Sequence, residues 1–203
     1  MSRAAMNGGM NAKTKRPAAR GVVHVRQEVH CGQEGLTIAA VADTHGRPHP
    51  GLSARIDELA PDLIVHAGDV GDVSVLRGLE TRARVVAVRG NIDGHDLPDF
   101  VTIDVRNDRG TLIKLLLTHV AVYGPRLRSD VARIARLEDA SLVVCGHSHV
   151  PFAAREGSIT VFNPGSAGPR RFQLPIVLGA IEVRANGASV RHIDCETGRG
   201  WTP

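Results

Sequence analysis

Residues 141–149 read Ser-Leu-Val-Val-Cys-Gly-His-Ser-His, an apolar run followed by two histidines that are two residues apart. A short run of this kind is typical of a buried strand. The histidines come where that strand would end, and imidazoles are common catalytic and metal-binding groups. The stretch therefore predicts a buried strand that delivers two functional side chains to its carboxyl end.

The same arrangement recurs earlier in the chain. Apolar runs predict strands at 36–42, 62–65 and 84–88, each followed at once by polar residues, and the apolar run 112–117 is followed in the same way. The polar clusters are Asp43-Thr44-His45-Gly46, His66-Ala67-Gly68-Asp69, Arg89-Gly90-Asn91-Ile92-Asp93 and Thr118-His119. Because the carboxyl ends of parallel strands share one edge of a sheet, we expect these clusters to converge in space.

Helical patterns separate the early strands. Apolar residues recur at helical spacing in three places: Leu52, Ile56 and Leu59; Val75, Leu76 and Leu79; and Val131, Ile134, Ala135 and Leu137. Alternation of strand and helix predicts a parallel sheet. The second half differs, because turn sequences at 107–110 and 186–187 predict antiparallel hairpins. We expect an α/β fold with a more antiparallel second half and no internal repeats.

The clusters supply carboxylates, an amide and imidazoles without thiolates, which suit two borderline divalent ions. Each residue alone has a structural interpretation: Asp72 before the pattern 73–79 is typical of a helix cap, and His119 could be a hydrogen-bonded core histidine. Five clusters at five strand ends favour a functional site. The candidates are Asp43, His45, Asp69, Asn91, His119, His147 and His149. His66 is left open between packing and support of a ligand, and His24, His30, His49 and His192 are interpreted as structural.

The composition bounds the class of protein. The 203 residues, 42% of them hydrophobic, predict one well-packed domain over residues 36–203. No apolar stretch approaches the roughly 18 residues of a membrane span, and three widely separated cysteines favour neither a disulfide framework nor a thiolate zinc site. We expect no membrane association and a cytoplasmic location. Residues 1–35 carry six basic and two acidic side chains, which account for the net charge of +4, and are expected to form a disordered basic leader.

The order of these motifs resembles the signature of the calcineurin-like metallophosphoesterase superfamily. The motifs are Asp-x-His, Gly-Asp, Gly-Asn, an isolated His and Gly-His-x-His. The finer spelling, including Cys-Gly-His-Ser-His-Val-Pro followed by Asn-Pro-Gly-Ser, is similar to its branch of small bacterial and archaeal phosphodiesterases. The resemblance covers about residues 36–185. It implies a two-sheet β-sandwich flanked by helices, a four-layer αββα fold.

The resemblance also implies the roles of the candidates. Asp43, His45 and His149 would hold one metal, Asn91, His119 and His147 the other, and Asp69 would bridge both. Asp69, Asn91 and His119 are the residues expected to be catalytic. The implied cofactors are two divalent ions, Mn²⁺ first, with Ni²⁺, Zn²⁺, Fe²⁺ or Co²⁺ as alternatives. The implied reaction is hydrolysis of a phosphodiester by in-line attack of a metal-bridging hydroxide.

Two positions depart from the family pattern. Many members have His directly after the Gly-Asn pair, where it is thought to protonate the leaving group, and here that position is Ile92. The small branch often continues its isolated histidine as Thr-His-Gly-His, whereas this chain has Thr118-His119-Val120-Ala121. His119 is therefore kept as a candidate ligand. Ile92, however, cannot act as a general acid.

Two other functions compete with a small-molecule phosphodiesterase. A scaffold subunit of eukaryotic retromer shares the implied fold, so a metal-binding scaffold for protein contacts is one alternative. A nuclease tethered by the basic leader is another, although the leader has no aromatic residue to stack on bases. We expect a small phosphodiester or phosphomonoester as substrate, do not favour nucleic acid, and leave the oligomeric state open.

Overall fold

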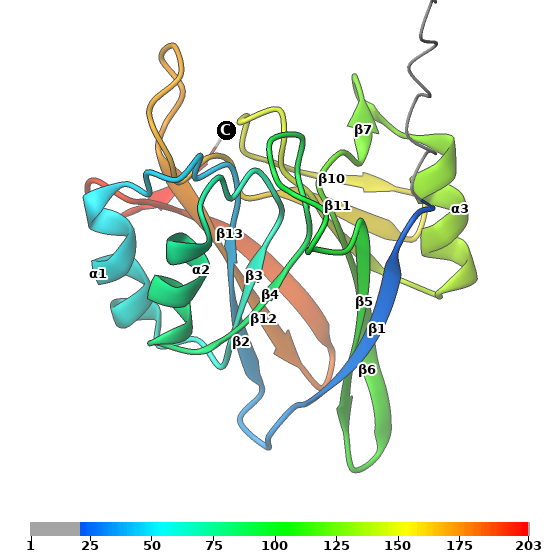
Figure 1. Cartoon of the computed structure of the whole chain (residues 1–203). Coiled ribbons are helices and arrows are strands. Elements are labelled where there is room, and N and C mark those ends of the chain that lie inside the picture. The colour runs from blue at the N-terminus through cyan, green and yellow to red at the C-terminus, as the bar shows by residue number, and fades with distance from the viewer. Residues whose placement is uncertain (1–20, 203) are drawn as a thin grey trace, which may run out of the picture.

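The computed structural model describes residues 21–202 and contains two six-stranded sheets packed face to face (Figure 1). The strands of the first sheet are, in spatial order, β1 (His24–His30), β5 (Phe100–Asn107), β6 (Gly110–Thr118), β9 (Leu142–Val144), β11 (Ile159–Asn163) and β10 (Phe152–Glu156). Those of the second are β14 (Gly200–Trp201), β13 (Gly187–Asp194), β12 (Val177–Arg184), β2 (Leu36–Val41), β3 (Leu63–His66) and β4 (Arg84–Ala87). A small hairpin pairs β7 (Val122–Tyr123) with β8 (Arg126–Leu127).

Three helices cover the outer faces of the sheets. α1 (Pro50–Leu59) and α2 (Val73–Glu80) pack on the second sheet, and α3 (Ser129–Leu137) packs on the first (Figure 1). The predicted spacing is confirmed, because Leu52 and Ile56 of α1 are buried against Ile64 of β3. Asp72 caps α2 as predicted, its carboxylate accepting a hydrogen bond from the N–H of Ser74 at 2.8 Å.

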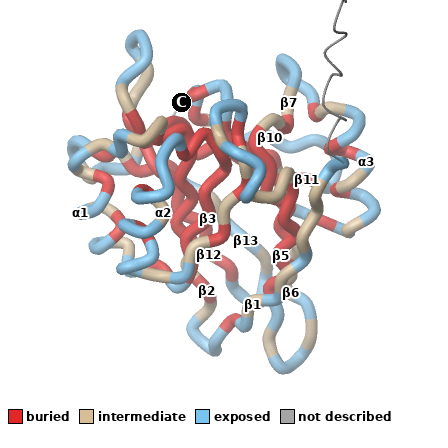
Figure 2. The backbone as a smooth tube through the Cα atoms, viewed as in Figure 1, coloured by how far each residue is buried: buried red, intermediate tan, exposed pale blue. Residues whose placement is uncertain are grey.

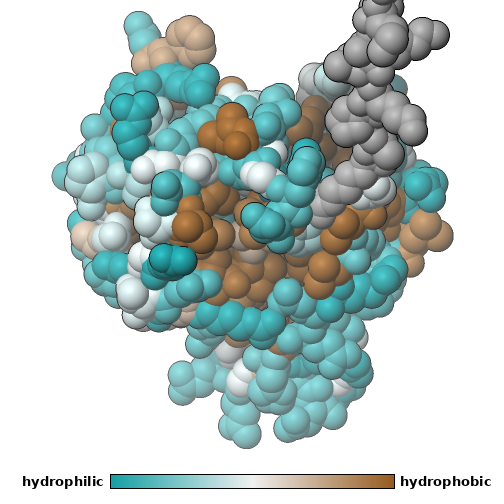
Figure 3. Space-filling model, in the orientation of Figure 1, coloured by the Kyte–Doolittle hydropathy of each residue, from teal (hydrophilic) through white to brown (hydrophobic). Residues whose placement is uncertain are grey.

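Burial is greatest where the two sheets face each other. One apolar cluster joins β2, β3 and β12 of the second sheet to β5, β6 and β9 of the first, with Ile38, Ile103 and Leu115 fully enclosed. Two further clusters lie between the sheets and their helices, so the layers follow the order helix, sheet, sheet, helix. Figure 2 shows the buried strands between exposed turns, and Figure 3 shows hydrophilic residues over the lower turns and apolar residues over β4. The predicted four-layer α/β sandwich is confirmed.

The first strands after β1 are parallel as predicted, and the second half is more antiparallel but includes β9, which pairs in parallel with both β6 and β11. β2, β3 and β4 are parallel, as are β6 and β9, whereas β5–β6 and β12–β13 are antiparallel hairpins closed by the predicted turn sequences. No helix among residues 21–202 is long and apolar enough to cross a membrane. The thiols of Cys31, Cys145 and Cys195 are free and buried.

The predicted boundary of the basic leader is wrong for residues 24–30. They form β1, which pairs in parallel with β5 from His24 opposite Phe100 to His30 opposite Arg106. The apolar side chains of Val25 and Val29 pack against the core between the sheets. The prediction of a disordered leader for residues 1–20 lies outside the described residues.

Candidate metal centre

The predicted ligands come from strand ends of both sheets. Asp43 and Asp69 follow the parallel strands β2 and β3 of the second sheet. His119 follows β6 of the first sheet, and His149 lies in the loop after β9. Asn91 follows β4, beside Ile92, whose N–H donates to Asp69 Oδ1 at 3.1 Å. The carboxyl edges of the two sheets therefore meet at one site.

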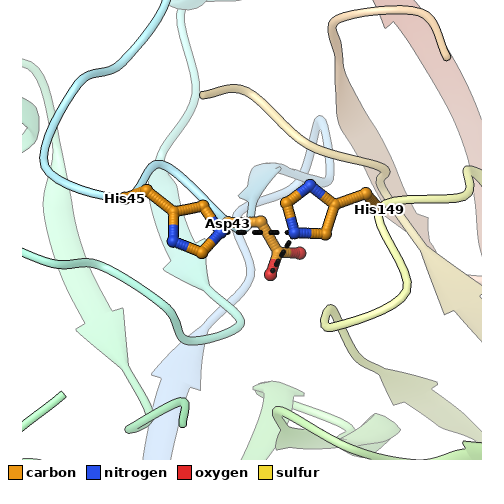
Figure 4. A group of neighbouring side chains, drawn as sticks. All are labelled: Asp43, His45 and His149. Atoms are coloured by element: carbon orange, nitrogen blue, oxygen red, sulfur yellow. Dashed lines mark hydrogen bonds and ion pairs between the residues drawn. The ribbon is translucent and has the colours of Figure 1, made fainter. Parts of the chain in front are cut away.

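One group consists of Asp43, His45 and His149 (Figure 4). Nε2 of His45 lies 3.2 Å from Nε2 of His149, and Nε2 of His149 lies 3.5 Å from Asp43 Oδ1. The two rings stack with centroids 5.1 Å apart and planes inclined by 17°. Three ligand atoms of these residues all lie within 4.8 Å of one another, which is close enough to share one cation.

A second group adjoins the first and consists of Asp43, Asp69 and His119. Asp69 also approaches the first group, because its carboxylate oxygens are 3.4 Å from His119 Nε2 and 3.8 Å from His45 Nε2. The His147 ring lies 5.2 Å from that of His119, and its peptide N–H donates to Asp43 Oδ2 at 3.0 Å. Asp43 belongs to both groups. The resemblance to the family implied that only Asp69 would contact both metals.

The backbone at these positions adopts an uncommon conformation. Eight non-glycine residues among those described have positive φ, and five of them are predicted ligands: Asp43 (55°), His45 (49°), Asp69 (52°), His147 (71°) and His149 (59°). Residues other than glycine adopt this region rarely and at a cost, and such strain gathers at functional sites. The backbone conformation therefore singles out the same side chains as the motifs do.

Glycines allow the loops to approach one another closely. A Cβ at Gly68 would lie 2.7 Å from His119 Nδ1, and one at Gly90 would lie 2.1 Å from the backbone nitrogen of Asp69. Neither position has room for a side chain. The Gly-Asp and Gly-Asn pairs of the sequence thus reflect contact between the two loops that carry Asp69 and Asn91.

Hydrogen bonds orient the imidazole of His119. Its Nδ1 lies 2.8 Å from the carbonyl oxygen of Ala67, which can only accept, so Nδ1 carries the proton. The lone pair is therefore on Nε2, which faces Asp69 and is buried without a hydrogen-bond partner among the described residues. A ring fixed through its other nitrogen is the usual arrangement for a histidine that binds a metal.

The electrostatics of the site also fit cations. Burial lowers the pKa of His149 to about 4 and lowers the pKa of His45 and His119, so these imidazoles are neutral and able to bind metal near pH 7. Burial, together with the neighbouring Asp69, raises the pKa of Asp43 to about 8. Divalent cations would offset this accumulation of buried carboxylates. The donor set and the neutral imidazoles thus match a site for metal ions.

Residues beside the candidate ligands hold the loops of the site in place. The carboxylate of Asp93 accepts hydrogen bonds from the N–H groups of Val70 (3.1 Å), Gly71 (2.9 Å) and Gly90 (2.7 Å). These contacts hold the loops after β3 and β4 together. His66, left open by the sequence, places Nε2 3.0 Å from Thr44 Oγ1 and so packs behind the Asp43–His45 loop.

A loop after β11 completes the site. Asn163 Nδ2 donates to the carbonyl of Gly146 at 2.8 Å, and Ser166 Oγ donates to the carbonyl of Asp43 at 3.0 Å. The exposed Arg171 contacts one candidate ligand directly, with Nη2 3.3 Å from His45 Nε2. The sequence of the adjacent Arg170 and Arg171 does not predict which of the two side chains contacts His45. His192, interpreted as structural, is buried and lies 2.8 Å from the carbonyl of Asn163 through Nε2.

Known proteins share both the sequence and the fold. A probable metallophosphoesterase of Methanocaldococcus jannaschii is 33% identical over 147 residues, covering 70% of this chain and 74% of that protein. The phosphodiesterase YfcE of Escherichia coli K12 is 28% identical over 107 residues, covering 51% of this chain and 55% of its own. The solved structure of vacuolar protein sorting 29 from Cryptosporidium parvum has a TM-score of 0.66 at 18% identity, over 82% of this chain and 95% of that one, and shows the fold alone. Residues 36–186 match the model of the calcineurin-like phosphoesterase superfamily domain, and the chain belongs to that superfamily.

Proposed function

We propose that this protein is a phosphodiesterase that depends on two divalent metal ions. The convergence of two neighbouring donor groups on Asp43 and Asp69 carries the proposal. Among the relatives, YfcE is named a phosphodiesterase, which favours a diester as substrate. In the proposed assignment, one ion is held by Asp43, His45 and His149, the other by Asn91, His119 and His147, and both by Asp69.

The protein supplies orientation and charge to this reaction. Bound metals would lower the pKa of a water nucleophile and offset charge on the phosphoryl oxygens. The N–H of Ile92 holds one oxygen of Asp69, and the carbonyl of Ala67 fixes the tautomer of His119. Ligands held in this way keep their separation during turnover, because their rotation would break these hydrogen bonds. Asp69, Asn91 and His119 are the proposed catalytic residues.

The ligand types bear on the metal and the substrate. Imidazole, carboxylate and amide donors without thiolate suit Mn²⁺, our first choice, and also Ni²⁺, Zn²⁺, Fe²⁺ and Co²⁺. Ile92 at the loop after β4 cannot give a proton to the leaving group. We therefore expect diesters with acidic leaving groups to react fastest.

A panel of substrates and metals tests the proposal. Phosphomonoesters, aryl and alkyl phosphodiesters and cyclic nucleotides are assayed with the full chain in Mn²⁺, Ni²⁺, Zn²⁺ and Mg²⁺, with a chelator as the control. We expect hydrolysis of aryl diesters that the chelator abolishes and Mn²⁺ restores. Failure of every metal to support hydrolysis, with the protein folded, would contradict the proposal and favour a scaffold of the same fold.

A further inference from the structure

Two adjacent arginines on the loop between β11 and β12 have different partners. Arg170 donates to the carbonyl of Leu174 at 2.7 Å and forms an ion pair with Glu196. Arg171 instead places Nη2 3.3 Å from Nε2 of His45. Among the described residues, Arg171 forms no ion pair with a carboxylate, so its charge is available to a ligand of the site.

The loop is anchored on the metal site itself. Ser166 Oγ donates to the carbonyl of Asp43, and the N–H of Ala167 donates to the carbonyl of Ala42, each at 3.0 Å. A Cβ at Gly168 would lie 2.4 Å from the carbonyl oxygen of Asp43, so only glycine permits this approach. The loop then rises above the edge of the sheets, in orange in Figure 1.

The far end of the loop is held as well. The N–H of Leu174 donates to the carbonyl of Arg171 at 3.1 Å, which closes a turn, and Arg170 binds the carbonyl of Leu174 across it. The backbone of Arg171 is therefore positioned by contacts on both sides, whereas its side chain is exposed. Such an arrangement presents an exposed charged group beside His45.

The charge of Arg171 acts on the candidate ligands. Burial is the main cause that lowers the pKa of His149, and the Arg171 guanidinium is the next. A guanidinium resting on a neutral imidazole gains little compared with one on an anion, because its donors fit pairs of carboxylate or phosphate oxygens. A cation bound through Nε2 of His45 would displace the guanidinium from that nitrogen, and an anionic substrate at the site would then offer it a better acceptor.

We propose that Arg171 is a catalytic residue whose guanidinium binds a non-bridging oxygen of the substrate phosphoryl group. This inference rests on the proposed phosphoesterase function and adds a substrate contact to it. Arginine keeps its proton at any working pH, so Arg171 stabilises developing charge on phosphorus-bound oxygens and gives no proton to the leaving group. It therefore does not replace the acid that Ile92 lacks.

Binding of inorganic phosphate to the metal-loaded full chain tests this role without turnover. Calorimetric titrations compare the wild type with Arg171→Ala, Arg171→Lys and Phe172→Ala, after the metal content of each has been measured. We expect Arg171→Ala to weaken phosphate binding about 10- to 100-fold, the range for a hydrogen bond to a charged group. Arg171→Lys should recover part of the loss, because it keeps the charge but not the paired donors.

Phe172→Ala is the matched control, because Phe172 is the next residue on the same loop and is 92% exposed. It should bind phosphate as the wild type does. An Arg171→Ala protein with full metal content and unchanged phosphate affinity would overturn the inference, and so would loss of metal in that variant, which would make Arg171 a support for His45. Absence of both hydrolysis and phosphate binding in the wild type would instead contradict the proposed function.

Discussion

Asp43 shows how burial shapes the chemistry of one residue. Its carboxylate is completely buried, belongs to both donor groups and accepts the N–H of His147. Burial and the nearby Asp69 raise its pKa to about 8, so the metal-free protein holds a proton there at pH 7. Metal ligation needs the ionised form, so cations and this proton compete for the same oxygens.

Metal binding at pH 7 should therefore release about one proton from Asp43. Mn²⁺ is titrated into the metal-free protein in two buffers of different ionisation enthalpy, and the difference in heat gives the protons released. Because Asp43 is protonated below a pKa of about 8, the apparent metal affinity should rise as the pH increases toward 8. Asp43→Asn removes the proton and serves as the comparison, and equal heats in both buffers for the wild type would contradict the prediction.

Asp69→Asn should lower kcat/KM by about 100-fold or more, because the amide lacks the charge that offsets two cations. The substitution keeps the shape of the side chain and the acceptor for Ile92 N–H, so the melting temperature should change little. Asp108→Asn, at an exposed turn, is the control and should have normal activity. A folded Asp69→Asn protein that retains two metals and full turnover would refute the two-metal assignment.

Ile92 should make the rate depend steeply on the pKa of the leaving group. The side chain is 54% exposed and lines a pocket of about 240 Å³ with Val73, Leu76 and Leu97. A positioned acid contributes about 10²- to 10⁴-fold, and the side chain of Ile92 has no proton to give. We measure kcat/KM over a series of substituted phenyl esters and expect Ile92→His to flatten the dependence.

His95 is the nearest rival for the role of acid. Its Nδ1 lies 2.8 Å from Nη1 of Arg89, which in turn pairs with Asp99, and this arrangement holds the ring toward Arg89. His95→Ala should leave the slope of the same ester series unchanged. A shallow slope in the wild type that steepens in His95→Ala would show that His95 is the acid.

At the level of elements, the edge strand β1 joins several parts of the fold. Val25 and Val29 pack on the core, Arg26 pairs with Glu138 at the end of α3, and Gln27 accepts from Arg84 of β4. Periodicity did not reveal this strand, because only Val25 and Val29 of its 7 residues are apolar and three polar residues separate them, in a segment that is basic overall. Its partner strand β5 lies far along the chain.

Deletion of residues 1–34 should therefore destabilise the protein more than deletion of residues 1–20, because only the longer deletion removes β1. Loss of β1 exposes one side of β5 and removes the contacts of Val25 and Val29. A loss of about 2 kcal/mol corresponds to a fall in melting temperature of about 4 to 8 °C for a domain of this size. Equal melting temperatures for the two truncated proteins would show that β1 contributes nothing to stability.

At the level of the whole molecule, the candidate metal centre links the two sheets. Asp43 and Asp69 belong to the second sheet, and His119 and His149 follow strands of the first. Cations held by all four would therefore connect the two halves of the sandwich. Ligands that bind only the folded state raise its stability by mass action.

Metal should thus raise the melting temperature of the whole domain in one transition. At 100 times its dissociation constant, a cation adds about 2.7 kcal/mol, or roughly 5 to 11 °C here. Thermal unfolding is followed with Mn²⁺ and with excess chelator. Mn²⁺ that binds by calorimetry without shifting the transition would show that the ligands of the two sheets do not share it.

The sequence by itself determined the repeated order of strand and polar cluster, the two hairpins, and the residue types of the candidate site. These features are local: side-chain periodicity reports burial within one element, and glycine-flanked Asp, Asn and His mark the strand ends. Only the tertiary structure decided that Asp43 belongs to both donor groups, that Arg171 rather than Arg170 faces His45, and that residues 24–30 complete a sheet. The physical reason is that each depends on contacts between segments 26 to more than 100 residues apart, such as the 126 between Arg171 and His45, which no local pattern encodes.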